Sequence, residues 1–125
     1  MKNTMEKKNE ILIAEDDSII ALDIRKYLEG LGYNISDVVC KGEELLAKAR
    51  QKKPALIISD INLKGELDGI EAIARLTESS TIPYIFVTAY DDYRRVVEIY
   101  HLEPLAFLKK PINYNELSDC VGNNL

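Results

Sequence analysis

Two cysteines, one histidine and the absence of long apolar runs limit what this 125-residue sequence can be. Cys40 and Cys120 form neither a disulfide framework nor the repeated spacing of a metal-binding motif, so we expect reduced thiols. No run of about eighteen apolar residues occurs, which excludes a membrane-spanning helix. His101 follows a predicted helix close to Pro104 and is expected to be a surface residue rather than a phosphodonor.

Basic residues are also in short supply, because 16 Lys and Arg face 21 Asp and Glu. The resulting net charge of −5 disfavours nucleic-acid binding, which requires a basic surface. The first residues, Met1–Glu10, are polar and lack the apolar core of a signal peptide. We therefore expect a cytoplasmic protein without membrane association, with a flexible N-terminal tail over 1–9 and one domain over 10–125.

Short apolar runs alternate with helical patterns along the whole chain. Strands are predicted over 11–14, 35–40, 55–59, 83–88 and 105–108. The first helix begins at Asp17 or Ser18 and places Ile20, Ile24, Tyr27, Leu28 and Leu31 on one face. Further helices are predicted over 43–52, from Asp68 to about 77, from Asp91 or Asp92 to about 101, and from Asn113 or Asn115, the last one short and frayed over 121–125. Strict alternation predicts an α/β fold in which a five-stranded parallel sheet carries helices on both faces.

Polar residues follow four of these strands, and the carboxyl ends of parallel strands share one edge of a sheet. Glu15, Asp16 and Asp17 follow the first strand, Asp60 the third, Thr88 and Ala89 the fourth, and Lys110 the fifth. Clustered carboxylates repel one another unless a cation or a raised pKa relieves them. Mg²⁺ or Mn²⁺ could be held by Asp16, Asp60 and the backbone carbonyl of Asn62, with Glu15 acting directly or through water.

Lys110 and Thr88 suit a phosphoryl group, since they offer a point charge and a hydroxyl donor. A carboxylate beside a cation and a lysine can accept such a group and become an aspartyl phosphate. The set Glu15-Asp16-Asp17, Asp60, Thr88-Ala89-Tyr90 and Lys110-Pro111 resembles the receiver domain of two-component response regulators. Intervals of 44, 28 and 22 residues separate Asp16, Asp60, Thr88 and Lys110, and the resemblance extends from Ile11 to about Val121.

The resemblance implies a flavodoxin-like sheet of order 2-1-3-4-5 and a role for each matched residue. Asp60 would take the phosphoryl group from a sensor histidine kinase or a phosphotransfer protein. Glu15 and Asp16 would bind the metal, Thr88 and Lys110 would hold the phosphoryl group, and Ala89 would leave space beside it. Asn62 and Tyr90 would flank the path of the hydrolytic water, and the bulk of Tyr90 predicts slow self-dephosphorylation.

The resemblance also implies a switch, in which Thr88 moves toward Asp60 and Phe107 fills the vacated space. The surface of the fourth helix, fifth strand and fifth helix would then change, to control a partner protein or an output domain. The same surface is a candidate for a homodimer. The Lys110–Pro111 bond is often cis in such proteins. The chain departs from the common pattern after Asp60, where the loop is one residue longer and Lys64-Gly65 replace a proline.

Three other functions are compatible with an α/β sheet that carries acids at its edge. A receiver-like scaffold would keep the fold without accepting phosphate. A phosphatase of the haloacid dehalogenase type would carry a second acid at the position of Asn62. A flavin-binding protein would need a Ser-, Thr- or Gly-rich phosphate loop where this chain has three acids after the first strand. The matched set favours a signalling domain whose only chemistry is its own phosphorylation and dephosphorylation.

Overall fold

A computed structural model describes residues 9–89, 96–98 and 100–125 of the chain. Its centre is a five-stranded parallel sheet of order β2-β1-β3-β4-β5. The strands are β1 (Glu10–Ala14), β2 (Asn34–Val39), β3 (Leu56–Asp60), β4 (Tyr84–Thr88) and β5 (Ala106–Lys109). This order and the parallel pairing confirm the predicted flavodoxin-like fold.

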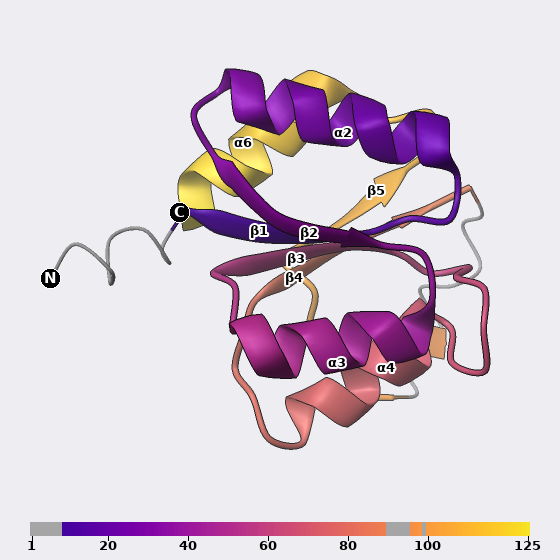
Figure 1. The fold of residues 1–125 in the computed structure, drawn as a ribbon. Coiled ribbons are helices and arrows are strands. Elements are labelled where there is room, and N and C mark those ends of the chain that lie inside the picture. Colours follow the sequence, from indigo (N-terminus) through magenta and orange to yellow (C-terminus); the bar gives the residue numbers. More distant parts are fainter. Residues whose placement is uncertain (1–8, 90–95, 99) are drawn as a thin grey trace, which may run out of the picture.

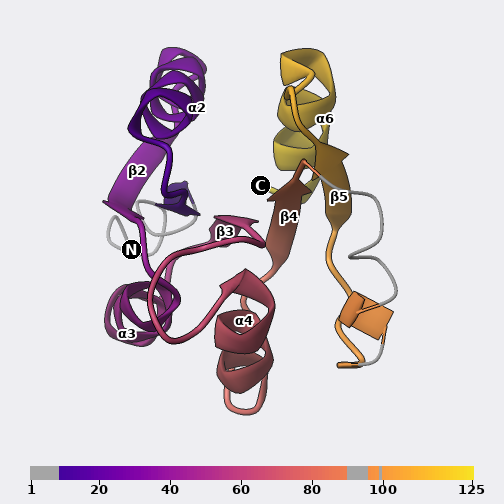
Figure 2. The ribbon, with the colours of Figure 1, turned by 90° about the vertical axis from the view of Figure 1, so that its right-hand side faces the viewer.

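Helices cover both faces of the sheet, as Figures 1 and 2 show. One face carries α2 (Ser18–Gly30) and α6 (Tyr114–Asn124), and the other carries α3 (Gly42–Lys52) and α4 (Gly69–Thr77). Side chains of β1 alternate between the two sides: Ile11 and Ile13 join the core beneath α2 and α6, whereas Leu12 and Ala14 join the core beneath α3 and α4. Burial on both faces explains the apolar runs within the central strands, Ile11–Ala14, Leu56–Ile58 and Ile85–Val87.

Polar caps determine where three of the helices begin. Asp17 precedes α2 and accepts hydrogen bonds from the N–H groups of Ile19 and Ile20. Asp68 precedes α4 and accepts from the N–H of Glu71, which in turn accepts from the N–H of Asp68. Asn113 precedes α6 and accepts a hydrogen bond from the N–H of Glu116. Each cap satisfies backbone donors that a helix leaves unpaired in its first turn, which is why these boundaries agree with the sequence pattern.

Two expectations about helix ends are wrong. Leu31 is 51% exposed rather than inward-facing, because it is the C-cap residue and lies beyond the last turn of α2. The last helix is neither short nor frayed: α6 runs for 11 residues to Asn124, and the N–H of Leu125 donates to the carbonyl of Val121. Buried Leu117 and Val121 tie this helix to the core.

Part of the predicted fourth helix lies outside the described residues. Val96, Val97 and Glu98 are described, and they are helical. Residues 1–8 of the predicted N-terminal tail are likewise not described. Asn9 is described, and its carbonyl accepts a hydrogen bond from the N–H of Asn34 at the start of β2. Among the described helices, none combines the length and apolar character needed to cross a bilayer.

Candidate functional site

Four of the polar residues predicted from the strand ends, Glu15, Asp16, Asp60 and Lys110, meet at the carboxyl edge of the sheet, which Figure 2 views from the front. Backbone hydrogen bonds hold the chain in register just past the strands. The N–H of Glu15 donates to the carbonyl of Val39, and the N–H of Lys110 donates to that of Thr88 at 2.7 Å. The pairing of β1 and β5 with their neighbours therefore continues one residue beyond the strands. This continuation fixes the points from which the Glu15 and Lys110 side chains leave.

The ammonium group of Lys110 joins two buried carboxylates. Its Nζ donates a hydrogen bond to Asp60 Oδ2 at 2.8 Å and lies 2.7 Å from Glu15 Oε1. Asp60 and Glu15 are only 5% and 3% exposed, so both charges are largely removed from water. The other oxygens accept backbone hydrogen bonds, Glu15 Oε2 from the N–H of Asp17 and Asp60 Oδ1 from the N–H of Asn62. The peptide bond between Lys110 and Pro111 is cis.

Burial changes the protonation of this group. It raises the pKa of Glu15 to about 7, and the nearby charge of Asp60 adds to the rise, while Lys110 and the N–H of Asp17 oppose it. Burial by itself would lower the pKa of Lys110. Hydrogen bonds and charges from Asp60 and Glu15 outweigh that effect, so the pKa of Lys110 lies above its usual value. The lysine therefore stays charged at neutral pH, whereas Glu15 is close to the midpoint of its titration.

Three carboxylates could hold a cation here. Glu15, Asp16 and Asp60 offer oxygens that lie within 4.8 Å of one another, a spacing that one hard cation can bridge. Glu15 Oε1 is buried and accepts no aligned hydrogen bond within the described part of the chain, although it contacts Lys110 as an ion pair. A buried oxygen with spare capacity, in an all-oxygen set, fits Mg²⁺ or Mn²⁺. Asp17 is outside the set, because its carboxylate caps α2.

The remaining predicted residues lie on β4 and β5 or just beyond β3 and β4. Thr88 is the last residue of β4 and is 1% exposed, and Ala89 follows it at an exposed bend. Asn62 is exposed just beyond Asp60. Phe107 on β5 is half-buried, and its ring meets that of Phe86 edge-on with 6.1 Å between centroids. Tyr90, predicted beside the path of the hydrolytic water, lies outside the described residues.

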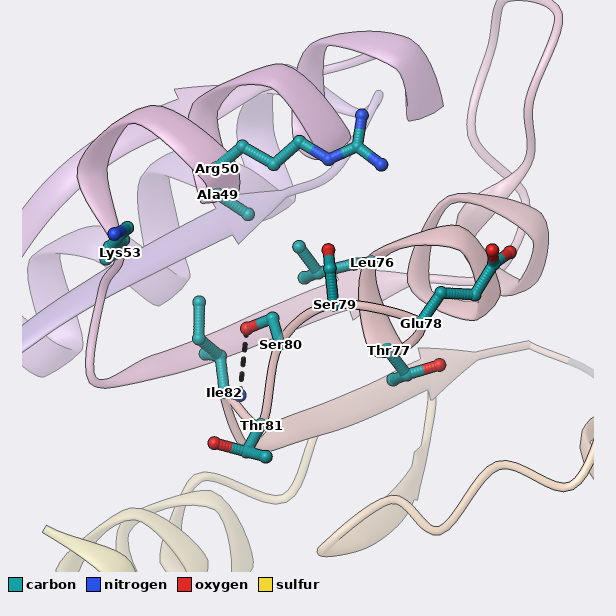
Figure 3. A pocket seen from close by; sticks show the side chains of 10 residues that line it. All are labelled: Ala49, Arg50, Lys53, Leu76, Thr77, Glu78, Ser79, Ser80, Thr81 and Ile82. Atoms are coloured by element: carbon teal, nitrogen blue, oxygen red, sulfur yellow. Dashed lines mark hydrogen bonds between the residues drawn. The ribbon is translucent and has the colours of Figure 1, made fainter.

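Two hollows differ in their relation to this edge. One of about 460 Å³ opens beside Glu15 and Asp16 and is also bounded by Arg25 and Cys40, so it gives access to the acids from the side of α2 and β2. A larger one, of about 720 Å³, lies between the C-terminal ends of α3 and α4 and includes Arg50, Ser79 and Ile82. Figure 3 shows this second hollow, with the Ser80 hydroxyl accepting from the N–H of Ile82. Its lining residues include the segment 77–82 just before β4, so this hollow lies at the opposite edge of the sheet from the acids.

Sequence comparison places this arrangement in a known family. The model of the response regulator receiver domain matches residues 11–121, which is almost the full chain. The chain belongs to the response regulator receiver domain family. This confirms the resemblance drawn from the strand-end residues. The extent of the match also agrees with the expected limits of Ile11 and about Val121.

Individual relatives agree with this assignment. The phyllosphere-induced regulator PhyR of Methylorubrum extorquens is 33% identical over 117 residues, which cover 93% of this chain and 43% of PhyR. The transcriptional regulatory protein PdtaR of Mycobacterium tuberculosis is 30% identical over 111 residues, covering 89% of this chain and 54% of PdtaR. The chain thus spans about half the length of these relatives, or less.

A solved structure of similar size shares the fold. The signal receiver domain of a modulated diguanylate cyclase from Desulfovibrio desulfuricans G20 is 32% identical, with a TM-score of 0.82. The match covers 92% of this chain and 91% of that one. A receiver domain on its own therefore accounts for nearly all of the present structure.

Proposed function

We propose that residues 10–125 form a receiver domain that accepts a phosphoryl group on Asp60 from a sensor histidine kinase or a phosphotransfer protein. The observation that carries this proposal is the contact of one ammonium group, Lys110 Nζ, with both Asp60 and Glu15 at 2.8 Å and 2.7 Å. Two buried acids therefore share one lysine, and a third acid, Asp16, offers an oxygen within 4.8 Å of theirs at the edge where ligands bind in such sheets. Family membership supports the same role.

In the proposed reaction a carboxylate oxygen of Asp60 forms a bond to phosphorus while the bond from phosphorus to the donor breaks. The electron pair of that broken bond leaves with the donor. Lys110 is placed to stabilise the phosphoryl oxygens, because its ammonium is already within hydrogen-bond distance of Asp60. Thr88 offers a hydroxyl from the end of the neighbouring strand, and exposed Ala89 leaves the approach open.

Glu15, Asp16, Asp60 and the backbone carbonyl of Asn62 are the groups that we propose to hold Mg²⁺ or Mn²⁺. Such a cation neutralises charge on the transferring oxygens and offsets repulsion among the carboxylates. Glu15 must lose its proton to bind the cation. Because its pKa is about 7, this deprotonation costs little free energy at neutral pH. Lys110 can shift its contact from the acids to a phosphoryl oxygen without losing an anionic partner.

For output we propose the two-state change that the sequence predicts. Thr88 would move toward the phosphorylated Asp60, and Phe107 would pack further inward, where it already borders the core beneath α3 and α4. Both residues end or lie on neighbouring strands, β4 and β5, so one movement can affect the other. The surface of the predicted helix 91–101, β5 and α6 would then control a partner protein, an output domain or a second copy of the chain.

Mass spectrometry of the intact protein tests the proposal. With a small phosphodonor such as acetyl phosphate and Mg²⁺, the mass should rise by one phosphoryl group. The gain should disappear in Asp60→Asn, which keeps the size of the side chain but removes the nucleophile, and should persist in Asp17→Asn, because Asp17 only caps a helix. No gain in the unmodified protein would favour the scaffold alternative and contradict a phosphoacceptor role.

A further inference from the structure

The loop between Asp60 and α4 is held by contacts at both ends. At its base the N–H groups of Leu63 and Gly69 both donate to the carbonyl of Ile61, at 3.2 Å and 2.8 Å. A Cβ on Gly69 would lie 2.1 Å from the carbonyl oxygen of Asp60, so the two backbones are in direct contact. This base holds Asn62, whose carbonyl is one of the proposed cation ligands. The base alone leaves the outer half of the loop, residues 64–67, to be fixed by something else.

The N-terminus of α3 fixes that outer half. The carboxylate of Glu43 accepts a hydrogen bond from the N–H of Glu66, with distances of 3.2 Å and 3.4 Å to its two oxygens. The N–H of Gly42 donates to the carbonyl of Lys64 at 3.3 Å. A Cβ on Gly42 would lie 2.0 Å from the carbonyl oxygen of Leu67, so only glycine allows the helix this close to the loop. Two successive residues of α3 therefore contact the loop backbone.

Gly65 makes the Glu43 contact possible. Its φ of +95° is a conformation that glycine adopts easily and other residues avoid. A Cβ at this position would also lie 2.3 Å from Glu43 Oε1. Lys64-Gly65 stand where the common receiver pattern has a proline, which would fix φ near −65° and remove an N–H. The departure from the family pattern thus lies where the Glu43 carboxylate contacts the loop.

We propose that Glu43 is a positioning residue for the cation site of this receiver. By holding residues 64–67 against α3, it keeps the loop in the conformation that presents the Asn62 carbonyl beside Asp16 and Asp60. The inference rests on the proposed function, since it concerns the same cation. The inference adds Glu43, a residue of α3 that lies 17 positions before Asp60 in the sequence and is not itself a proposed ligand.

Glu44 provides a matched control on the same helical turn. Its carboxylate also accepts backbone hydrogen bonds, but from Lys41 at 3.2 Å and Cys40 at 3.3 Å, which cap α3 itself. Glu43→Ala and Glu44→Ala therefore remove the same charge and a comparable number of hydrogen bonds one residue apart. Glu44 also borders the hollow that opens beside Glu15 and Asp16, so Glu44→Ala reports the effect of removing a nearby charge. Of these two side chains, Glu43 alone hydrogen-bonds to residues 64–67 within the described part of the chain.

Titration calorimetry with MgCl₂ measures the effect directly. Removing a group that orients metal ligands commonly weakens metal binding about 10- to 100-fold; Glu43 is exposed and acts through a loop, so we expect about 3- to 10-fold for Glu43→Ala. Glu44→Ala should change the dissociation constant less than about twofold. Glu43→Gln keeps an oxygen that can accept the hydrogen bond from the N–H of Glu66. Its dissociation constant for Mg²⁺ should therefore lie between those of Glu43→Ala and the parent. This variant replaces Glu43→Ala in the test if the alanine variant does not fold.

Two further measurements separate positioning from general stability. Hydrogen exchange at the Glu66 amide should accelerate in Glu43→Ala and remain unchanged in Glu44→Ala. Phosphorylation by acetyl phosphate should need more Mg²⁺ in Glu43→Ala and reach the parent rate at saturating Mg²⁺. An unchanged magnesium constant, with exchange at Glu66 accelerated, would overturn the positioning role. Failure of the parent protein to bind Mg²⁺ would instead contradict the proposed function.

Discussion

The raised pKa of Glu15 predicts an unusual dependence of stability on pH. The perturbation is Glu15→Gln, which keeps the shape of the side chain and removes its titration. In the folded protein the pKa of Glu15 is about 7, against a model value of 4.5. Between these values the folded state binds more protons than the unfolded state, so stability must fall as pH rises. The loss begins above pH 4.5 and levels off as the pH rises past about 7.

The magnitude follows from the same two values. A pKa of about 7 in the folded state and 4.5 in the unfolded state corresponds to about 2 kcal/mol of stability lost between pH 5.5 and 8.5. The lower limit stays above the sequence pI of 4.9, where the protein carries little net charge. With a urea dependence of about 2 kcal/mol per molar, the loss shifts the unfolding midpoint by about 1 M relative to Glu15→Gln.

Urea unfolding followed by far-ultraviolet circular dichroism, in a chelator that removes divalent cations, measures this difference. The relevant quantity is the stability of the parent minus that of Glu15→Gln at each pH, so that shifts at other groups cancel. Glu29→Gln is the control, because solvent screens the exposed pair of Glu29 with Arg25 on α2. Parallel pH curves for the parent and Glu15→Gln would refute the argument that burial holds a proton on Glu15.

Three other perturbations test the site and the fold around it. Lys110→Met leaves two buried carboxylates without their ammonium partner and should destabilise the metal-free protein by about 3 kcal/mol in urea unfolding at pH 8; an unchanged midpoint would mean that the ion pairs add nothing. Gly69→Ala forces a Cβ against the Asp60 carbonyl and should cost about 2 kcal/mol or more, whereas Gly122→Ala, with open space on α6, should gain about 0.5 kcal/mol; equal effects would argue against the close approach. Mg²⁺ at ten times its dissociation constant should stabilise the parent by about 1.4 kcal/mol, and the same concentration should have little effect on Asp16→Asn; equal stabilisation of both proteins would exclude Asp16 as a ligand.

The sequence predicted which residues meet, because parallel strands end at one edge and each strand end is visible as the limit of an apolar run. Glu15, Asp60 and Lys110 could be placed together on that ground alone. The sharing of Lys110 between Asp60 and Glu15 could not be predicted, since it depends on side-chain conformations and on the burial that raises the pKa of Glu15. The spacing of residues along the chain predicts neither the side-chain conformations nor the burial.

The contact of Glu43 with Glu66 was missed for a different reason. It joins residues 23 positions apart, and a glutamate in the first turn of a helix already has a local explanation as a favourable charge at the helix dipole. Gly65 was the one available signal, because a glycine in place of a proline indicates a loop that turns differently. Leu31 was misassigned because helical periodicity does not reveal where the helix ends.

The excess negative charge at the carboxyl edge of the sheet links the stability of the metal-free protein to the proposed cation binding. One ammonium group at 2.8 Å from Asp60 provides roughly 6 kcal/mol of attraction at an effective dielectric constant of 20, but removing each charge from water costs several kcal/mol. Three acids with one lysine therefore keep an excess of negative charge, and a raised pKa at Glu15 partly relieves it. A divalent cation at the proposed site would offset this excess charge and would compete with the proton on Glu15. Under the proposed function, the burial that raises the pKa of Glu15 would also favour cation binding, so variants that remove one of these acids should bind Mg²⁺ more weakly.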